Sequence, residues 1–233
     1  MSRRHRLSGF TLVELLVALF VLSLLAVLSW RGLDGMARAQ QQTQARSDEV
    51  QALQIGLAQW SADLDAMLQV PQMTALDWNG RVLRLTRRAP PGQSENVVVV
   101  GWSRRTTTAG SRWTRWQSPP LTTRGQVEDA WLRADAWAQN QAEDGSAVAV
   151  TGLQEWQVFY YRSDAWTNPL SSDATQASPT VPPPASPPAP VTGSRAGQIP
   201  DGVRIVLTLA PGQAITGELI RDWVRPTVGG GKS

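Results

Sequence analysis

A single apolar segment near its start constrains this chain of 233 residues more than any other feature. Residues 10–30 contain one charged side chain, Glu14, and Arg31 follows them. An α-helix of this length rises roughly 30 Å, the thickness of the hydrocarbon core of a bilayer. The sequence therefore predicts that residues 10–31 form a transmembrane helix and that the chain crosses the membrane once.

Two simpler interpretations of this segment are a cleaved secretory signal and an ordinary signal anchor. A secretory signal has an apolar region of about 7–15 residues and a small-residue cleavage site, and no such site occurs before Trp30. Neither interpretation explains Glu14, because a carboxylate in a membrane helix costs about 2.5 kcal/mol or more and persists mainly where it has a partner. Cleavage of the Gly9–Phe10 bond would create a suitable cation, the α-amino group of Phe10 on a neighbouring chain.

The basic residues indicate how the chain is oriented in the membrane. Arg3, Arg4 and Arg6 precede the apolar segment, and without them the remaining Lys and Arg residues balance the 19 acidic residues. Positive charge beside a membrane helix is typical of its cytoplasmic end. We therefore expect residues 1–9 on the cytoplasmic side and the C-terminal domain in the periplasm.

A nucleic-acid partner would require a basic patch on the folded part of the chain. One group of arginines could supply it, but we interpret these residues as solvated faces of strands and turns. The sequence therefore predicts no nucleic-acid partner. The group consists of Arg81, Arg84, Arg87, Arg88, Arg104, Arg105, Arg112 and Arg115.

The scarcity of reactive side chains excludes several classes of enzyme. The chain has no cysteine, and its one histidine, His5, precedes the expected cleavage. Ser-His-Asp catalysis, Cys-His catalysis and the usual zinc sites are therefore excluded in the cleaved chain, whereas catalysis by two carboxylates is not. The acidic groups lack the ligand loop of an EF-hand, so we predict no catalytic residue, no cofactor and no metal site. These groups are Asp63 with Asp65, Glu128 with Asp129, and Glu143 with Asp144.

A helical pattern continues beyond the membrane segment. Apolar residues recur at helical spacing from Val50 to Met67, and Pro71 ends the pattern. We predict one helix over about residues 11–69, with Gly32 and Gly35 as weak points because glycine costs roughly 1 kcal/mol in a helix interior. The periplasmic part, residues 32–70, is expected to pack on its own C-terminal domain rather than in a coiled coil, because the stripe is short.

After Pro71 the pattern changes to that of β-strands. The predicted fold class is α+β, with the long N-terminal helix packed on a mostly antiparallel sheet formed by residues 71–226. Residues 127–138 are either a short helix or a loop. The predicted strands are 81–86, 96–102 and 112–117, a hairpin of 147–151 with 155–161 about Gly152, and a final pair of 203–209 with 218–224.

Two other regions allow more than one interpretation. Residues 171–197 are rich in Pro and Ser and predict a disordered or polyproline II loop, either a tolerated insertion or a docking peptide. Residues 227–233 are predicted to be a flexible tail. Trp113 and Trp116, two of the eleven tryptophans, could form a stacking platform for carbohydrate or single-stranded nucleic acid, but packing in the core is favoured.

The start of the chain resembles the leader and first helix of type III prepilins. The resemblance rests on a short basic leader that ends in Gly9, then Phe10, Glu14 and a hydrophobic helix. It implies that prepilin peptidase cleaves after Gly9 at the bacterial inner membrane and methylates the amino group of Phe10. It also implies that Glu14 pairs with the N-terminus of an adjacent subunit during fibre assembly.

Later segments are similar to J-type minor pseudopilins of type II secretion, the GspJ/PulJ family. The similarity implies a structural subunit, not an enzyme, that joins I-type and K-type minor pseudopilins and the major pseudopilin in a pseudopilus that supports export of folded proteins. Two alternatives are a minor pilin of a type IV pilus, serving assembly, adhesion or DNA uptake, and a membrane-anchored periplasmic enzyme using two carboxylates. The similar segments are residues 29–34, 53–64, 152–161 and 199–209.

Overall fold

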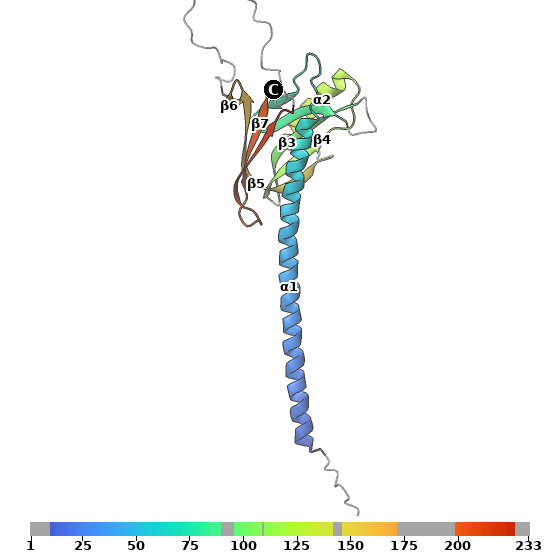
Figure 1. The fold of residues 1–233 in the computed structure, drawn as a ribbon. Coiled ribbons are helices and arrows are strands. Elements are labelled where there is room, and N and C mark those ends of the chain that lie inside the picture. The colour runs from blue at the N-terminus through green and yellow to red at the C-terminus, as the bar shows by residue number, and fades with distance from the viewer. Residues whose placement is uncertain (1–9, 90–95, 109, 142–145, 172–198, 227–233) are drawn as a thin grey trace, which may run out of the picture. The chain divides into compact units, whose positions relative to one another are not determined.

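The computed structural model describes residues 10–89, 96–108, 110–141, 146–171 and 199–226 (Figure 1). The first element is helix α1 (Leu12–Asp65), and strands and a second helix follow it. The chain divides into two compact units, residues 1–48 and residues 49–233. In its described part, the first unit consists of α1, whereas the second contains the end of α1 and all the other elements.

Helix α1 passes through both of the predicted weak points without interruption. It ends at Asp65, before the predicted end at residue 69, because the next residues pair with strand β2 (Val82–Arg88). The N–H of Arg88 donates to the carbonyl of Ala66 at 3.0 Å, and the N–H of Leu68 donates to the carbonyl of Thr86 at 3.0 Å. These bonds to the sheet replace the next helical turn.

The second unit is built on one sheet in which every strand pairing is antiparallel. The strand order is β1-β2-β3-β4-β5-β7-β8, with β6 paired to β5. The α+β class and the long helix on an antiparallel sheet are therefore confirmed. The predicted strands missed β1 and β6, which have only three residues each. The remaining strands are β1 (Leu76–Trp78), β3 (Val97–Thr107), β4 (Gly110–Gln117), β5 (Val148–Arg162), β6 (Ala165–Thr167), β7 (Gly202–Leu209) and β8 (Gly217–Val224).

Strand β5 corrects one prediction, because the hairpin expected about Gly152 does not form. The strand runs unbroken and changes neighbours, pairing with β4 over its first part and with β7 over its second part. Gly152 lies at the change, beside a shift in register, and its N–H and carbonyl are both bonded to the side-chain amide of Gln213 at 3.0 Å. The glycine admits a close neighbour here instead of turning the chain.

The last turns of α1 pack on one face of the sheet. Leu53, Trp60 and Leu64 are buried against alternate residues of the strands, as the apolar stripe predicted. Burial of such side chains supplies the main favourable term in folding. The sheet residues of this core include Leu83, Leu85, Val98, Val100, Trp102, Trp113, Val158, Ile205 and Leu207.

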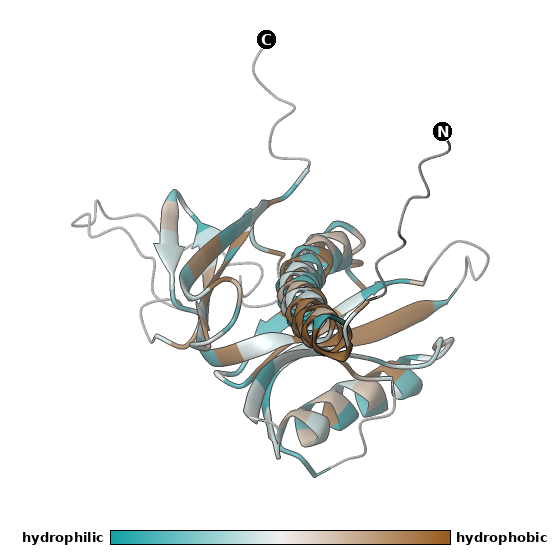
Figure 2. Cartoon of the chain, turned by 90° about the horizontal axis from the view of Figure 1, so that it is seen from below, coloured by the Kyte–Doolittle hydropathy of each residue, from teal (hydrophilic) through white to brown (hydrophobic). Residues whose placement is uncertain are grey.

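Helix α2 (Arg124–Ala138) covers the opposite face of β2 and β3 (Figure 2). The undecided segment 127–138 is thus helical, and the helix begins earlier than that segment. Thr123 caps it in a capping box with Gln126, in which each side chain accepts from the other residue's backbone N–H. The second core contains Val82, Val99, Trp116, Leu121, Val127, Ala130, Ala134 and Trp137.

Candidate functional site

In the first unit, every described residue of the chain is exposed in the single subunit. Helix α1 is long and apolar enough to cross a membrane, and Figure 2 shows its hydrophobic start end-on. Leu15, Leu19 and Leu22 each expose more than half of their side-chain surface. Apolar surface on this scale requires a bilayer or the helices of other subunits, which is consistent with membrane anchoring.

Of the three predicted site residues, Gly9 lies outside the described residues, Phe10 is exposed, and Glu14 is in the first turn of α1. Glu14 accepts hydrogen bonds from the backbone N–H and the hydroxyl of Thr11, both at 2.9 Å. Among the described residues it has no ion-pair partner. Thr11 and Glu14 have the spacing of a capping box, so Glu14 also starts the helix. The Thr-x-x-Glu pattern ahead of an apolar run is a signal in the sequence from which this cap can be predicted.

The second unit contains a carboxylate in the opposite situation. Asp63, near the end of α1, has no exposed side-chain surface. Arg115 donates to it through Nε at 2.7 Å and Nη2 at 2.8 Å, and Nη1 of Arg87 lies 3.1 Å away. The indole N–H of Trp102 donates to Asp63 at 2.9 Å, and the side-chain amide of Gln59 does so at 2.9 Å. Donors from three strands and the helix thus converge on a single carboxylate.

The interpretation of the arginine group as solvated faces is correct for Arg81, Arg88 and Arg104, which are exposed, but wrong for other members of the group. The side chains of Arg84, Arg87 and Arg115 are only 16%, 11% and 14% exposed. A buried charge is tolerated when it is paired and fully hydrogen-bonded, and Asp63 meets both conditions. Its two arginine partners lie far along the chain, so no local pattern in the sequence marks Asp63 as the centre of an ion-pair network.

Two further carboxylates of α1 accept hydrogen bonds from the C-terminal part of the sheet domain, one from β8 and one from the connection between β7 and β8. The indole N–H of Trp223 on β8 donates to Asp65 at 2.7 Å, and the backbone N–H of Ala214 donates to Glu49 at 2.7 Å. Asp63 and Asp65, which the sequence presented as an acidic pair, therefore each accept from protein donors. Within the described parts of the chain, no group of three or more His, Cys, Asp or Glu residues could hold a metal ion.

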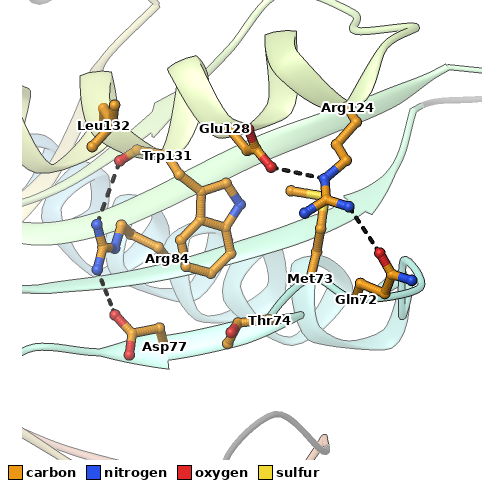
Figure 3. Close-up of a pocket in the computed structure, with 9 residues that line it drawn as sticks. All are labelled: Gln72, Met73, Thr74, Asp77, Arg84, Arg124, Glu128, Trp131 and Leu132. Carbon is orange, nitrogen blue, oxygen red and sulfur yellow. Dashed lines mark hydrogen bonds and ion pairs between the residues drawn. The ribbon is translucent and has the colours of Figure 1, made fainter.

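A groove of about 490 Å³ lies between α2 and the β1 edge of the sheet (Figure 3). Its charges are satisfied internally: Arg84 pairs with Asp77 at 2.5 Å, and Arg124 pairs with Glu128 at 2.8 Å. Each carboxylate has its own arginine, so the two do not form a pair suited to general acid–base chemistry. The lining residues are Gln72, Met73, Thr74, Asp77, Arg84, Arg124, Glu128, Trp131 and Leu132.

The tryptophans do not form an open stacking platform at Trp113 and Trp116. Both rings are buried, Trp113 against Trp102 on the α1 side and Trp116 against Trp137 on the α2 side. Packing in the two cores is therefore their role, as the sequence favoured.

Comparison with known protein families gives a match at the start of the chain. Residues 4–30, which include Gly9, Phe10 and Glu14, match the family described as the prokaryotic N-terminal methylation motif. The chain thus carries a prepilin-type N-terminal methylation motif.

For the rest of the chain the comparisons are less informative. No curated protein sequence matches it. A chain in the crystal structure of the GspK-GspI-GspJ complex from the enterotoxigenic Escherichia coli type 2 secretion system is similar over 76% of this chain and 96% of its own length. That similarity has 14% identity and a TM-score of 0.43.

Proposed function

We propose that this protein is a minor pseudopilin of the J type, a structural subunit of a type II secretion pseudopilus. The observation that carries the proposal is the methylation motif over residues 4–30 with Glu14 at its fifth position after Gly9. The resemblance of residues 29–34, 53–64, 152–161 and 199–209 to J-type pseudopilins supports the finer assignment.

In this proposal, prepilin peptidase cleaves the Gly9–Phe10 bond and methylates the new amino group. Residues 10–31 hold the subunit in the inner membrane, and the remainder lies in the periplasm. The cation that Glu14 requires in an apolar environment is the N-terminal amine of the next subunit, because an unpaired carboxylate in lipid costs several kcal/mol. Pairing of this kind fixes the axial step between neighbouring subunits of the fibre.

The sheet domain would then provide lateral contacts rather than chemistry. Its buried carboxylate is saturated by arginines, and the carboxylates of its groove are paired one to one. The proposed partners are I-type and K-type minor pseudopilins and the major pseudopilin. No catalytic residue, cofactor or nucleic-acid partner belongs to this proposal.

The processing step is tested by mass spectrometry of the full chain purified from its native host. We expect a mature chain that begins at Phe10 with a methylated amine. A chain that retains residues 1–9 contradicts the fibre-subunit proposal.

The role of Glu14 is tested by Glu14→Gln, because Gln can keep the capping hydrogen bond while losing the charge. We expect the variant to be processed and inserted normally but to be absent from purified fibres. Glu14→Asp is the matched variant that keeps the charge. Normal incorporation of the Gln variant would show that charge pairing is not the function of this residue.

The choice between a pseudopilus and a type IV pilus is tested by affinity purification of the full chain from detergent-solubilised membranes. Recovery of I-type and K-type pseudopilins supports the J-type assignment. Recovery of type IV pilus subunits instead supports the alternative.

A further inference from the structure

The two ends of the sheet differ in how they are protected. Strand β1 forms one end with only three residues, and its neighbouring groove is bordered by α2. Strand β8 forms the other end with eight residues; it contains no proline, and its charged residues are Glu218, Arg221 and Asp222. Natural proteins usually shorten, charge or cover such an edge, because its free backbone groups recruit other strands. Strand β8 carries charges, but it is neither short nor covered by a helix in the described part of the chain.

The hydrogen bonds of β8 show which of its backbone groups are free. Just beyond the strand, the N–H of Arg225 donates to the carbonyl of Asp201 at 2.8 Å. That bond continues the β7–β8 register, and hydrogen-bonded pairs alternate along an antiparallel ladder. The groups of alternate residues therefore point away from β7, toward the open side of the sheet. These residues are Glu218, Ile220, Asp222 and Val224.

The side chains of the same four residues lie on the sheet face opposite α1, since Trp223 points toward the core. Ile220 and Val224 are 54% and 63% exposed. Asp222 between them is neutralised by Arg204, which donates to its two carboxylate oxygens at 2.7 Å each. The edge thus combines unpaired backbone groups with an apolar strip whose one interior charge is already paired.

The apolar strip continues onto the neighbouring strands. The register places Val206 beside Ile220, and Phe159 beside Arg204. The Arg204 guanidinium also lies 4.3 Å from the ring centre of Trp166, which holds it in place from the other side. Among the described residues, no helix covers this face, because α2 packs on β2 and β3. The side chains of a strand added to β8 could pack against this apolar strip.

A second copy of this chain fits the edge poorly. In an antiparallel pairing of two β8 strands about Arg221, two arginines would lie directly opposite each other. In a pairing about Ile220, Glu218 of each copy would oppose Asp222 of the other. Like charges directly opposite each other destabilise a sheet. These two registers disfavour a second copy, and a strand of different sequence, with an apolar residue opposite Ile220 and an acidic residue opposite Arg221, would match the edge better.

We propose that β8 is a docking edge on which a different subunit of the same assembly adds an extended strand, pairing its backbone with Glu218, Ile220, Asp222 and Val224. This proposal rests on the proposed function, since it names the surface by which this subunit contacts a partner. Main-chain hydrogen bonds supply affinity in such strand addition, and the alternate side chains supply specificity.

Hydrogen–deuterium exchange tests the proposal without any substitution. The full chain in detergent is compared with the complex purified from membranes, with residue-level fragmentation. In the complex we expect the amides of residues 218, 220, 222 and 224 to exchange at least about tenfold more slowly. The amides of 219, 221 and 223, which pair with β7, are expected to be protected in both samples. A contact made by side chains alone would not produce this alternation.

The outcomes separate this proposal from the assignment as a fibre subunit. A complex that forms while the four amides keep their free exchange rates overturns the docking edge and leaves the fibre-subunit assignment standing. Failure to form any complex with pilin-type subunits overturns both. The isolated chain is also measured at rising concentration. If the same amides become protected there, a second copy binds the edge, and the claim that the partner is a different subunit is overturned.

A variant provides an independent test. Ile220→Pro removes an outward N–H but none that pairs with β7, a position at which an edge strand tolerates proline. We expect about a tenfold lower yield of the complex and unchanged resistance of the isolated chain to trypsin. Ile220→Val is the matched control, because it keeps both the N–H and an apolar side chain. An Ile220→Pro chain that is folded and assembles like wild type overturns the proposal.

Discussion

Helix α1 carries two carboxylates whose surroundings are opposite. Asp63 is completely buried and accepts from Arg115, Arg87, Trp102 and Gln59 of its own chain. Glu14 is exposed, and the hydrogen bonds that the structure gives it come from Thr11. A carboxylate in an apolar environment needs a compensating charge. Asp63 therefore serves the fold of one subunit, whereas Glu14 has a requirement that a neighbouring subunit can meet.

The comparison predicts the largest effect for Asp63→Ala, because it leaves two partly buried arginines without their carboxylate. We expect the free energy of unfolding of the second unit to fall by about 3–5 kcal/mol, as measured by tryptophan fluorescence in denaturant on the full chain in detergent. Asp34→Ala is the control on the same helix, since the Asp34–Arg38 pair is largely exposed and contributes about 0–1 kcal/mol. Equal losses of stability for the two substitutions would contradict the claim that the buried ion pairs of Asp63 hold the fold together.

A smaller loss is expected for Gly56→Ala. A Cβ at this position would collide with Val150 on β5, and overpacking of this kind costs about 1–3 kcal/mol. Gly32→Ala is the matched control, because nothing lies near its Cβ in the single chain. We expect the Gly32 variant to unfold at the same denaturant concentration as the wild type. A loss at Gly32 would show that the first part of α1 is also packed within the subunit.

The next largest effect concerns how the free energy of unfolding depends on pH. Burial raises the pKa of Tyr160 well above its ordinary value, and the nearby Asp77 carboxylate raises it further. The unfolded chain therefore loses the phenolic proton near pH 10 while the folded chain keeps it. Stability is unaffected below pH 10 and falls by up to about 1.4 kcal/mol per pH unit above it. Tyr160→Phe should flatten the unfolding profile between pH 10 and 11, and an unchanged profile would contradict this origin.

The smallest effect is expected for Glu14→Gln on the stability of the sheet domain, within about 0.5 kcal/mol of wild type. The capping hydrogen bond is kept, and the hydrogen bonds that the structure gives Glu14 lie within the first turn of α1. The same fluorescence measurement checks this value. A clear loss of stability would mean that Glu14 and Asp63 are both structural residues.

Much of the fold could be predicted from the sequence, because its signals are local. The membrane segment, the stripe that includes Leu53 and Trp60, and the valine-rich strand β3 are all periodic patterns that depend on near neighbours. The unbroken course of β5 could not be predicted, since Gly152 marks a turn as readily as a close approach. Glycine is needed at this position because the side chain of Gln213, which is distant in sequence, lies where a Cβ would be in close contact with it.

The functional and structural sites also divide into those that a local sequence pattern predicts and those that it does not. Gly9, Phe10 and Glu14 form a compact motif that could be recognised, and its role in processing and pairing remains a prediction. Asp63 could not be recognised, because its arginines follow it at distances of 24 and 52 positions. The free edge of β8 was also hidden, since a sequence does not reveal which strand lies last in a sheet.

The ion pairs of Asp63 impose an order on the maturation of the protein. As the polypeptide emerges from its N-terminus onward, α1 is complete long before Arg115 appears. Before then Asp63 can pair with Arg87 of β2, but not with Arg115, which donates two of its hydrogen bonds. A chain interrupted before β4 would leave Asp63 with one of its two arginines and would expose the incomplete core to chaperones and proteases.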